Sequence, residues 1–219
     1  MKTVSVVGQD VSSEVIDEAA GILDQGGLIC LPCVRSYRII SDLTNPKAVT
    51  RLMQSKSRTA KKPSLVFVAN RGMLDEVVVE MSPLAERLGR EFWPGPLTIL
   101  FAAHPSLPRK VTRQLGTGDG RIGVRIPTNQ LVRRIVETLG RPVLASSANK
   151  QKKSGAASPA QVRKNFYHRV GLFLDAGDLP PGPASTVVDL DGGTPVVVRP
   201  GAIPSEELAE LAERRAHAS

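Results

Sequence analysis

The chain has 219 residues, a formal net charge of +8 and 41% hydrophobic residues, of which few are aromatic. No apolar run is long enough to span a membrane, and the polar segment 1–10 does not match a secretory signal, so we expect a cytoplasmic protein. The length suits one large or two small domains with an aliphatic core.

Basic residues are segregated along the chain. Segments 51–62 and 150–169 contain lysine and arginine without any acid, whereas acids gather at 206–213. Segregated charge favours a nucleotide or nucleic-acid ligand, and a solvated basic surface is the alternative. The scarcity of aromatic side chains argues against sequence-specific recognition of single strands, which relies on base stacking.

Hydrophobic periodicity and turn signals predict alternating helices and strands. Residues 13–23 form one apolar helical stripe that ends at Gly26-Gly27. Further helices are predicted to start at Asn45-Pro46, Ser82-Pro83, Asn129, Ser158-Pro159 and Ser205. Strands are predicted at 28–31, 65–69, 97–102, 122–126, 142–145, 170–174, 186–190 and 196–198. We therefore predict a single α/β domain over 1–219 with a twisted, mixed open sheet.

The segment 141–149 joins a short apolar strand to Ser146, Ser147 and Asn149. In open α/β sheets, ligands bind beyond the carboxyl ends of strands, where hydroxyl and amide groups can hold a polar ligand. A helix cap or turn is the alternative interpretation of these residues.

Cys30 and Cys33 form a C-x-x-C pair at the end of the strand 28–31. Residues three apart in a strand point to opposite faces, and no helix start follows them. Zinc would need further ligands, and the chain has only three histidines. We therefore do not interpret the pair as a redox or metal site.

Clustered cations suggest a phosphate site. Lys56, Arg58 and Lys62 lie between a helix and the next strand, where they could clamp a polyphosphate. Arg125 lies within an apolar strand and Arg199 ends another, so each needs an anionic partner. A structural ion pair is the alternative for each arginine alone. Together with the polar end of segment 141–149, these cations predict a nucleotide site.

A series of motifs resembles the YrdC-like threonylcarbamoyl-adenylate synthases. In chain order they are Gly26-Gly27, Lys56-x-Arg58, WPGPLT at 93–98, GVRIP at 123–127, SSAN at 146–149, STVVD at 185–189 and RPG at 199–201. The resemblance covers about residues 15–205, and the WPGPLT and S-x-N motifs are its most specific parts.

The resemblance implies a twisted sheet around a concave basic cavity. It also implies ATP, with Mg²⁺, bicarbonate and L-threonine as substrates, and threonylcarbamoyl-AMP and pyrophosphate as products. The product would serve the modification of a tRNA adenosine beside the anticodon. Such chemistry needs no protein nucleophile, because a carbamate oxygen attacks the α-phosphorus while the protein positions charge.

By position, the resemblance implies two groups of binding residues and no catalytic nucleophile, and it names no metal ligands. The nucleotide side would comprise Lys56, Arg58, Lys62, Asn149 and Arg199. The substrate side would comprise Cys33, Tyr37, Arg125, Ser147 and Ser185.

The front of the site departs from the family pattern. Where the family reads Pro-Thr-Asp/Glu-Thr-x-Tyr-Gly, residues 32–38 read Pro-Cys-Val-Arg-Ser-Tyr-Arg. Phe67 replaces a histidine, Arg121 a threonine and Ala184 a glutamate. These departures predict that the nucleotide side is retained, and that the amino-acid side has gained cations and lost a carboxylate.

Two alternatives to the synthase function remain. One is a paralogue that uses a nucleotide with another, more anionic acceptor. The other is a module that binds tRNA or double-stranded RNA without catalysis.

Overall fold

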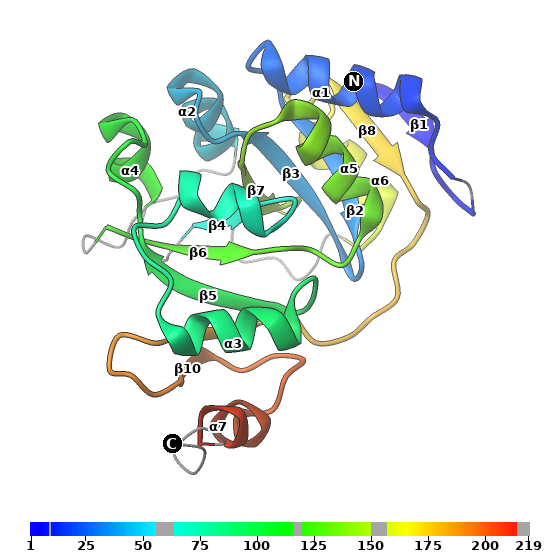
Figure 1. Ribbon diagram of the computed structural model, residues 1–219. Helices are drawn as coiled ribbons and strands as arrows, with labels where there is room; N and C mark the ends of the chain where they lie inside the picture. The colour runs from blue at the N-terminus through cyan, green and yellow to red at the C-terminus, as the bar shows by residue number, and fades with distance from the viewer. Residues whose placement is uncertain (9, 56–63, 116–119, 150–156, 214–219) are drawn as a thin grey trace.

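In the computed structural model, described residues form one mixed sheet of ten strands, with the order β1-β8-β2-β3-β7-β4-β6-β5-β9-β10 (Figure 1). The described residues are 1–8, 10–55, 64–115, 120–149 and 157–213. The strands are β1 (Lys2–Ser5), β2 (Ile29–Cys33), β3 (Ser36–Asp42), β4 (Leu65–Phe67), β5 (Leu97–Ala102), β6 (Arg121–Arg125), β7 (Val143–Ser147), β8 (Leu172–Asp175), β9 (Thr186–Asp189) and β10 (Val196–Arg199). The mixed α/β sheet predicted from the sequence is confirmed.

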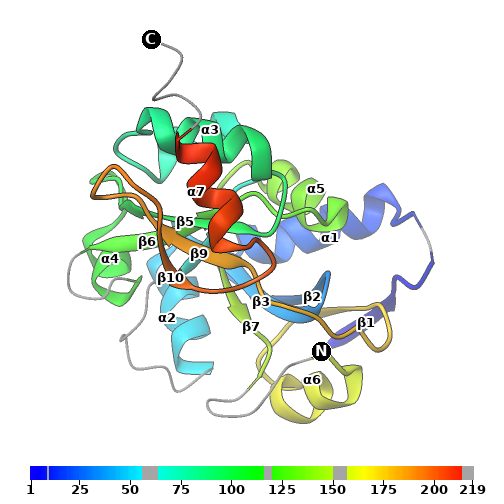
Figure 2. The ribbon, with the colours of Figure 1, turned by 90° about the horizontal axis from the view of Figure 1, so that it is seen from below.

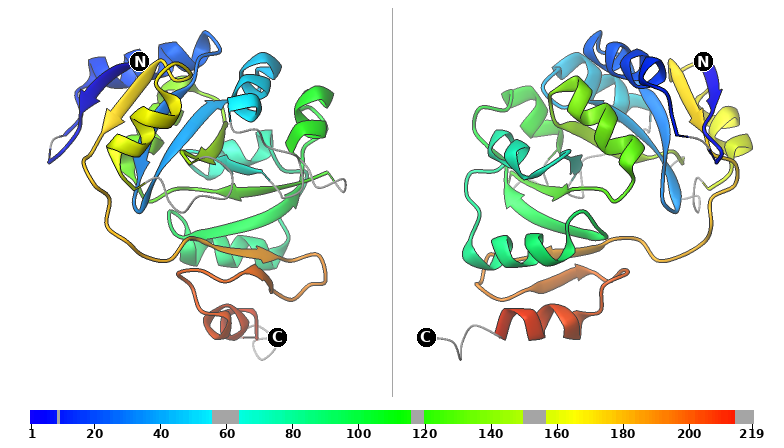
Figure 3. Two further views of the ribbon diagram at one scale, coloured as in Figure 1. Left: turned by 180° about the vertical axis from the view of Figure 1, so that it is seen from behind. Right: turned by 45° about the vertical axis from the view of Figure 1, so that its right-hand side comes forward.

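The helices are α1 (Ser13–Asp24), α2 (Pro46–Ser55), α3 (Pro83–Phe92), α4 (Arg109–Leu115), α5 (Gln130–Leu139), α6 (Pro159–Phe166) and α7 (Ser205–Glu213), with a 3₁₀ helix η1 (Arg71–Glu76). Helices α1 and α5 lie side by side (Figures 1 and 2). At the other end of the molecule, α7 lies near α3, beyond β10 (Figure 3). No helix in the described ranges is long and apolar enough to cross a membrane.

Several predicted helix starts are confirmed by their hydrogen bonds. The Asn129 side chain accepts from the backbone N–H of Val132 at 3.2 Å, and Gly140 ends α5 with a φ of 69°. Ser82 accepts from Ala85 at 3.2 Å at the start of α3. These side chains satisfy N–H groups that have no partner within the helix, and glycine adopts the left-handed conformation without strain.

The sequence analysis missed β1, β3, η1 and α4. The omission of β3 matters most, because residues 32–38 at the front of the site form a hairpin. In this hairpin Cys33 pairs with Ser36, and the tip holds Val34 at a φ of 46°. A β-branched residue at positive φ is rare, so the sequence carries no ordinary signal for this turn.

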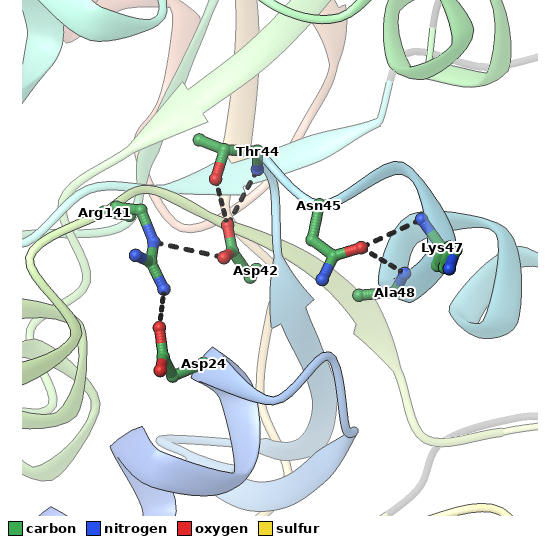
Figure 4. A network of polar contacts seen from close by, with 7 residues as sticks. All are labelled: Asp24, Asp42, Thr44, Asn45, Lys47, Ala48 and Arg141. Atoms are coloured by element: carbon green, nitrogen blue, oxygen red, sulfur yellow. Dashed lines mark hydrogen bonds and ion pairs between the residues drawn. The ribbon is translucent and has the colours of Figure 1, made fainter.

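A buried carboxylate belongs to a network of polar contacts that joins β3 to α1 (Figure 4). Asp42, at the end of β3, has a side chain that is 4% exposed. One of its oxygens accepts hydrogen bonds from the backbone N–H and hydroxyl of Thr44, at 2.8 and 2.7 Å. The other lies 3.1 Å from Nε of Arg141, which also binds Asp24 at the end of α1. Arg141 therefore connects α1 and β3 by pairing with the carboxylates of Asp24 and Asp42.

We predict that Arg141→Met lowers the free energy of unfolding by about 1–3 kcal/mol, because Asp42 would keep its buried charge without its cation. Asp24→Asn removes the exposed contact of the same arginine and should cost at most about 0.5 kcal/mol. Urea denaturation of both variants measures the difference. Equal losses would show that the buried pair has no special role in stability.

Candidate functional site

Arginine side chains of two central strands project from the same face of the sheet. Arg38 on β3 lies opposite Ser147 on β7, and Arg125 on β6 lies opposite Phe67 on β4. Phe67 is also opposite Val143, which is four residues from Ser147 in the same strand. Because opposed residues share a face and strand residues alternate, Arg38 and Arg125 point to one side.

Arg199 on β10 points to this side as well. Both Arg199 and Thr98 of β5 lie opposite Val187 of β9. Leu100, two residues after Thr98, lies opposite Gly123. Since Gly123 is two residues from Arg125 in β6, the same alternation places Arg199, Thr98 and Arg125 on one face.

We call this side of the sheet the arginine face, after Arg38, Arg125 and Arg199. Two strands separate β3 from β6, and two more separate β6 from β10. In a flat sheet, each of these separations would be about 14 Å. Burial nevertheless lowers the pKa of Arg125 and Arg199, and the positive charge of Arg38 lowers both pKa values further. The guanidinium group of Arg38 therefore lies within electrostatic reach of the other two.

Backbone carbonyls and hydroxyls hold two of the arginines in place. Nε of Arg125 donates to the carbonyl of Gly95 at 2.7 Å, within the WPGPLT motif. Arg199 donates to the carbonyl of Ser185 at 2.7 Å and to its hydroxyl at 3.0 Å. The Ser185 hydroxyl lies 3.0 Å from that of Thr98. These contacts connect four of the sequence motifs at one site.

The arginine face lacks compensating negative charge. Burial lowers the pKa of Arg38, and a negative charge on the sulfur of Cys33 would raise it. No ion pair within the described ranges includes Arg38, Arg125 or Arg199. Partly desolvated cations without partners favour the binding of an anion, so this geometry suits phosphate or carboxylate ligands.

The structure brings together most of the predicted site residues that it describes. Cys33 lies on the arginine face, because it is two residues beyond Leu31, which pairs with Arg38. The hydroxyl of Ser147 donates to the side-chain oxygen of Asn149 at 2.5 Å, just beyond β7. The predicted phosphate clamp lies outside the described residues: Lys56, Arg58 and Lys62.

Tyr37 is the predicted substrate residue that the structure places elsewhere. It precedes Arg38, points to the opposite face of β3 and is fully buried. Its hydroxyl donates to the carbonyl of Gly177 at 2.7 Å and accepts from the backbone N–H of Ala176 at 2.9 Å. Burial also raises the pKa of Tyr37. Tyr37 thus anchors the segment after β8, and its role in substrate binding stays a prediction.

Arg121 is not an unpaired cation added to the pocket. Its guanidinium group forms two hydrogen bonds with Asp189 on β9, at 2.7 and 2.6 Å. This pair ties β6 to β9 across β5. Of the cations gained relative to the family pattern, Arg38 is therefore the one that contributes to the arginine face.

Cys30 and Cys33 are both buried free thiols on opposite faces of β2, as the spacing predicted. Within the described ranges, no group of three His, Cys, Asp or Glu side chains could hold a metal ion.

Sequence reasoning placed Arg38 in the altered segment at the front of the site, but named neither Arg38 nor Thr98 as a binding residue. Arg38 could have been found by the argument used for Arg125, since it also interrupts an apolar run, before Ile39-Ile40. Thr98 belongs to a quoted motif, but only strand pairing reveals its contact with Ser185.

The fold and the arginine face define an α/β protein with a cationic face on its central sheet. The chain belongs to the Sua5/YciO/YrdC family. The model of this family, which carries the description "Telomere recombination", matches residues 21–201. This match confirms the family resemblance inferred from the motifs.

Curated relatives include the threonylcarbamoyl-AMP synthase of Pyrococcus abyssi, which is 33% identical over 91% of this chain and 58% of its own length. A putative threonylcarbamoyl-AMP synthase of Mycobacterium tuberculosis is 32% identical over 91% of this chain and 89% of its own. The chain thus spans little more than half of the first relative.

Solved structures agree with this assignment. Sua5 of P. abyssi complexed with L-threonine superposes with a TM-score of 0.87 at 30% identity, covering 96% of this chain and 61% of that one. YciO of E. coli superposes with a TM-score of 0.83 over 95% of this chain and 100% of its own. At 23% identity, YciO supports the fold alone.

We predict that Gly201→Ala destabilises the protein by about 1–3 kcal/mol, as overpacking typically does. A Cβ at Gly201 would lie 2.4 Å from the carbonyl carbon of Ser185 and the nitrogen of Thr186, so it would displace the strand that binds Arg199. Gly192→Ala is the matched control, because a Cβ there meets nothing within 4 Å. Thermal and urea unfolding compare the two. Equal stability of both variants would refute the close approach at Gly201.

Proposed function

We propose that this protein is a nucleotidyltransferase that forms a threonylcarbamoyl-AMP-type product from ATP, bicarbonate and an amino acid. The observation that carries the proposal is the arginine face with the Ser185 and Thr98 hydroxyls, in a chain of the Sua5/YciO/YrdC family. The curated relatives supply the reaction class.

The reaction would proceed in two steps. The amino group of the amino acid combines with bicarbonate to give a carbamate and water. A carbamate oxygen then attacks the α-phosphorus of ATP, the bond from that phosphorus to the β-phosphate oxygen breaks, and pyrophosphate leaves. Neither step needs a protein nucleophile, so the side chains act by positioning the reactants and stabilising negative charge.

The binding residues keep the roles that the family resemblance implies. In this proposal, Arg199 and Asn149 bind the nucleotide, together with Lys56, Arg58 and Lys62. Mg²⁺ would arrive with ATP as the counterion of its phosphates. Arg125, Ser147, Ser185 and Cys33 line the amino-acid side. Arg125 suits a carboxylate, because its guanidinium offers a planar fork and is oriented by the carbonyl of Gly95.

Threonine fits this pocket poorly at its ammonium group. The family places an acid where this chain has Val34, which cannot accept a hydrogen bond from an ammonium group. On the described part of the arginine face, the strand residues Asp42 and Asp189 are each already paired with an arginine. We therefore propose that the reaction class is retained and that L-threonine is a weak substrate.

We predict slow threonine-dependent pyrophosphate release from ATP and bicarbonate by the natural chain. The combined variant Cys33→Thr, Val34→Asp, Arg35→Thr and Arg38→Gly should raise it at least about tenfold, because one recovered charge interaction corresponds to this factor or more. Aspartate also tolerates the positive φ at position 34 better than valine does.

The assay compares both proteins with and without L-threonine. Absence of nucleotide-dependent turnover in both would refute the proposed reaction class. Equally fast turnover by both would retain the class and refute the role of the altered hairpin.

The RNA-binding alternative stays a prediction. It rests on the basic segments 51–62 and 150–169, of which 56–62 and 150–156 lie outside the described residues.

A further inference from the structure

Arg38 is the least satisfied cation of the arginine face. Its Nε–H is buried and donates to no acceptor within the described part of the chain. Arg125 and Arg199, by contrast, each donate to a backbone carbonyl. A buried donor without a partner is costly, and this cost would be relieved by an anion bound against it.

The surroundings of Arg38 increase its need for an anion. Its positive charge acts on Arg125 and on Arg199, so it lies close to both the amino-acid side and the nucleotide side. Its neighbour across the strand pair is Ser147, whose hydroxyl is neutral. Cys33 is the nearby group that can carry a negative charge, and its thiol is buried.

The number of positive charges indicates the kind of ligand. An amino acid with a neutral side chain brings one carboxylate, which Arg125 can bind, and the phosphates of a nucleotide can bind Arg199. Arg38, which Arg125 separates from Arg199 along the sheet, then has no carboxylate or phosphate from either ligand. A ligand with a second negative group would fill this position and would form charge-assisted hydrogen bonds with the guanidinium.

We propose that Arg38 makes the amino-acid side of this pocket specific for an acceptor that carries a second anionic group, a carboxylate or a phosphate on its side chain. The inference rests on the proposed function, since it names the acceptor class of the same site. It makes Arg38 a specificity-determining residue where the family pattern has glycine.

Calorimetry tests this preference in the absence of ATP, with L-threonine, O-phospho-L-threonine and L-aspartate as probes. The natural chain should bind at least one of the doubly charged amino acids about 10- to 100-fold more tightly than L-threonine, which is the range for one charge-assisted hydrogen bond. Tighter binding of O-phospho-L-threonine would indicate a phosphate, and tighter binding of L-aspartate a carboxylate.

Arg38→Gly should abolish the preference. Arg38→Gln retains most of the side-chain volume without the charge and should do the same, which separates charge from folding. Arg35→Ala is the matched control from the same hairpin, because Arg35 is exposed and donates to the carbonyl of Pro181 at 2.5 Å. It should keep the preference.

Two results would overturn the inference. One is equal affinity of the natural chain for all three probes. The other is a loss of ATP affinity in Arg38→Gln with the amino-acid preference unchanged, which would assign Arg38 to the phosphate clamp.

Pyrophosphate release separates this inference from the proposed function. A binding preference without turnover of any probe would contradict the reaction class alone. Turnover with L-threonine and no preference for a second charge would contradict the inference alone.

Discussion

The site depends on one constraint: three arginines from separated strands lie on one face of the sheet without a carboxylate to neutralise them. Arg38, Arg125 and Arg199 come from β3, β6 and β10, which a flat sheet would keep apart. Burial lowers the pKa of each, and like charge lowers those of Arg125 and Arg199 further. The fold thus bears an electrostatic cost that a bound anion relieves, so the same feature opposes stability and favours binding.

The rest of the structure limits how this charge can relax. The carbonyls of Gly95 and Ser185 fix two guanidinium groups, and the close approach at Gly201 fixes the backbone at Ser185, just before β9. Positive charge elsewhere on the sheet is paired: Arg121 with Asp189, and Arg141 with Asp42. Carboxylates thus neutralise Arg121 and Arg141, whereas among the described residues none forms an ion pair with Arg38, Arg125 or Arg199. Preorganised charge of this kind suits a reaction in which negative charge moves between phosphate oxygens.

Local signals made much of the fold predictable. The strand Leu97–Ala102 was predicted with its observed bounds, and the start of α5 at Asn129 was predicted from the sequence. The β3 strand was not, because its turn at Val34-Arg35 lacks the usual glycine or asparagine.

Long-range consequences of the fold were equally hidden. The Arg121–Asp189 pair joins residues 68 apart. The opposite orientations of Tyr37 and Arg38 follow from strand register, which the sequence does not define alone. Motifs located the site, but only the pairing of the strands showed that Arg38 shares a face with Arg125 and Arg199.

The most direct measurement is a crystal structure with a non-hydrolysable ATP analogue and the tightest-binding amino-acid probe. We predict the phosphates beside Arg199 and Ser185, and the second anionic group of the amino acid against Arg38. Phosphates bound away from the arginine face, or Arg38 turned into solvent with both ligands present, would contradict the account.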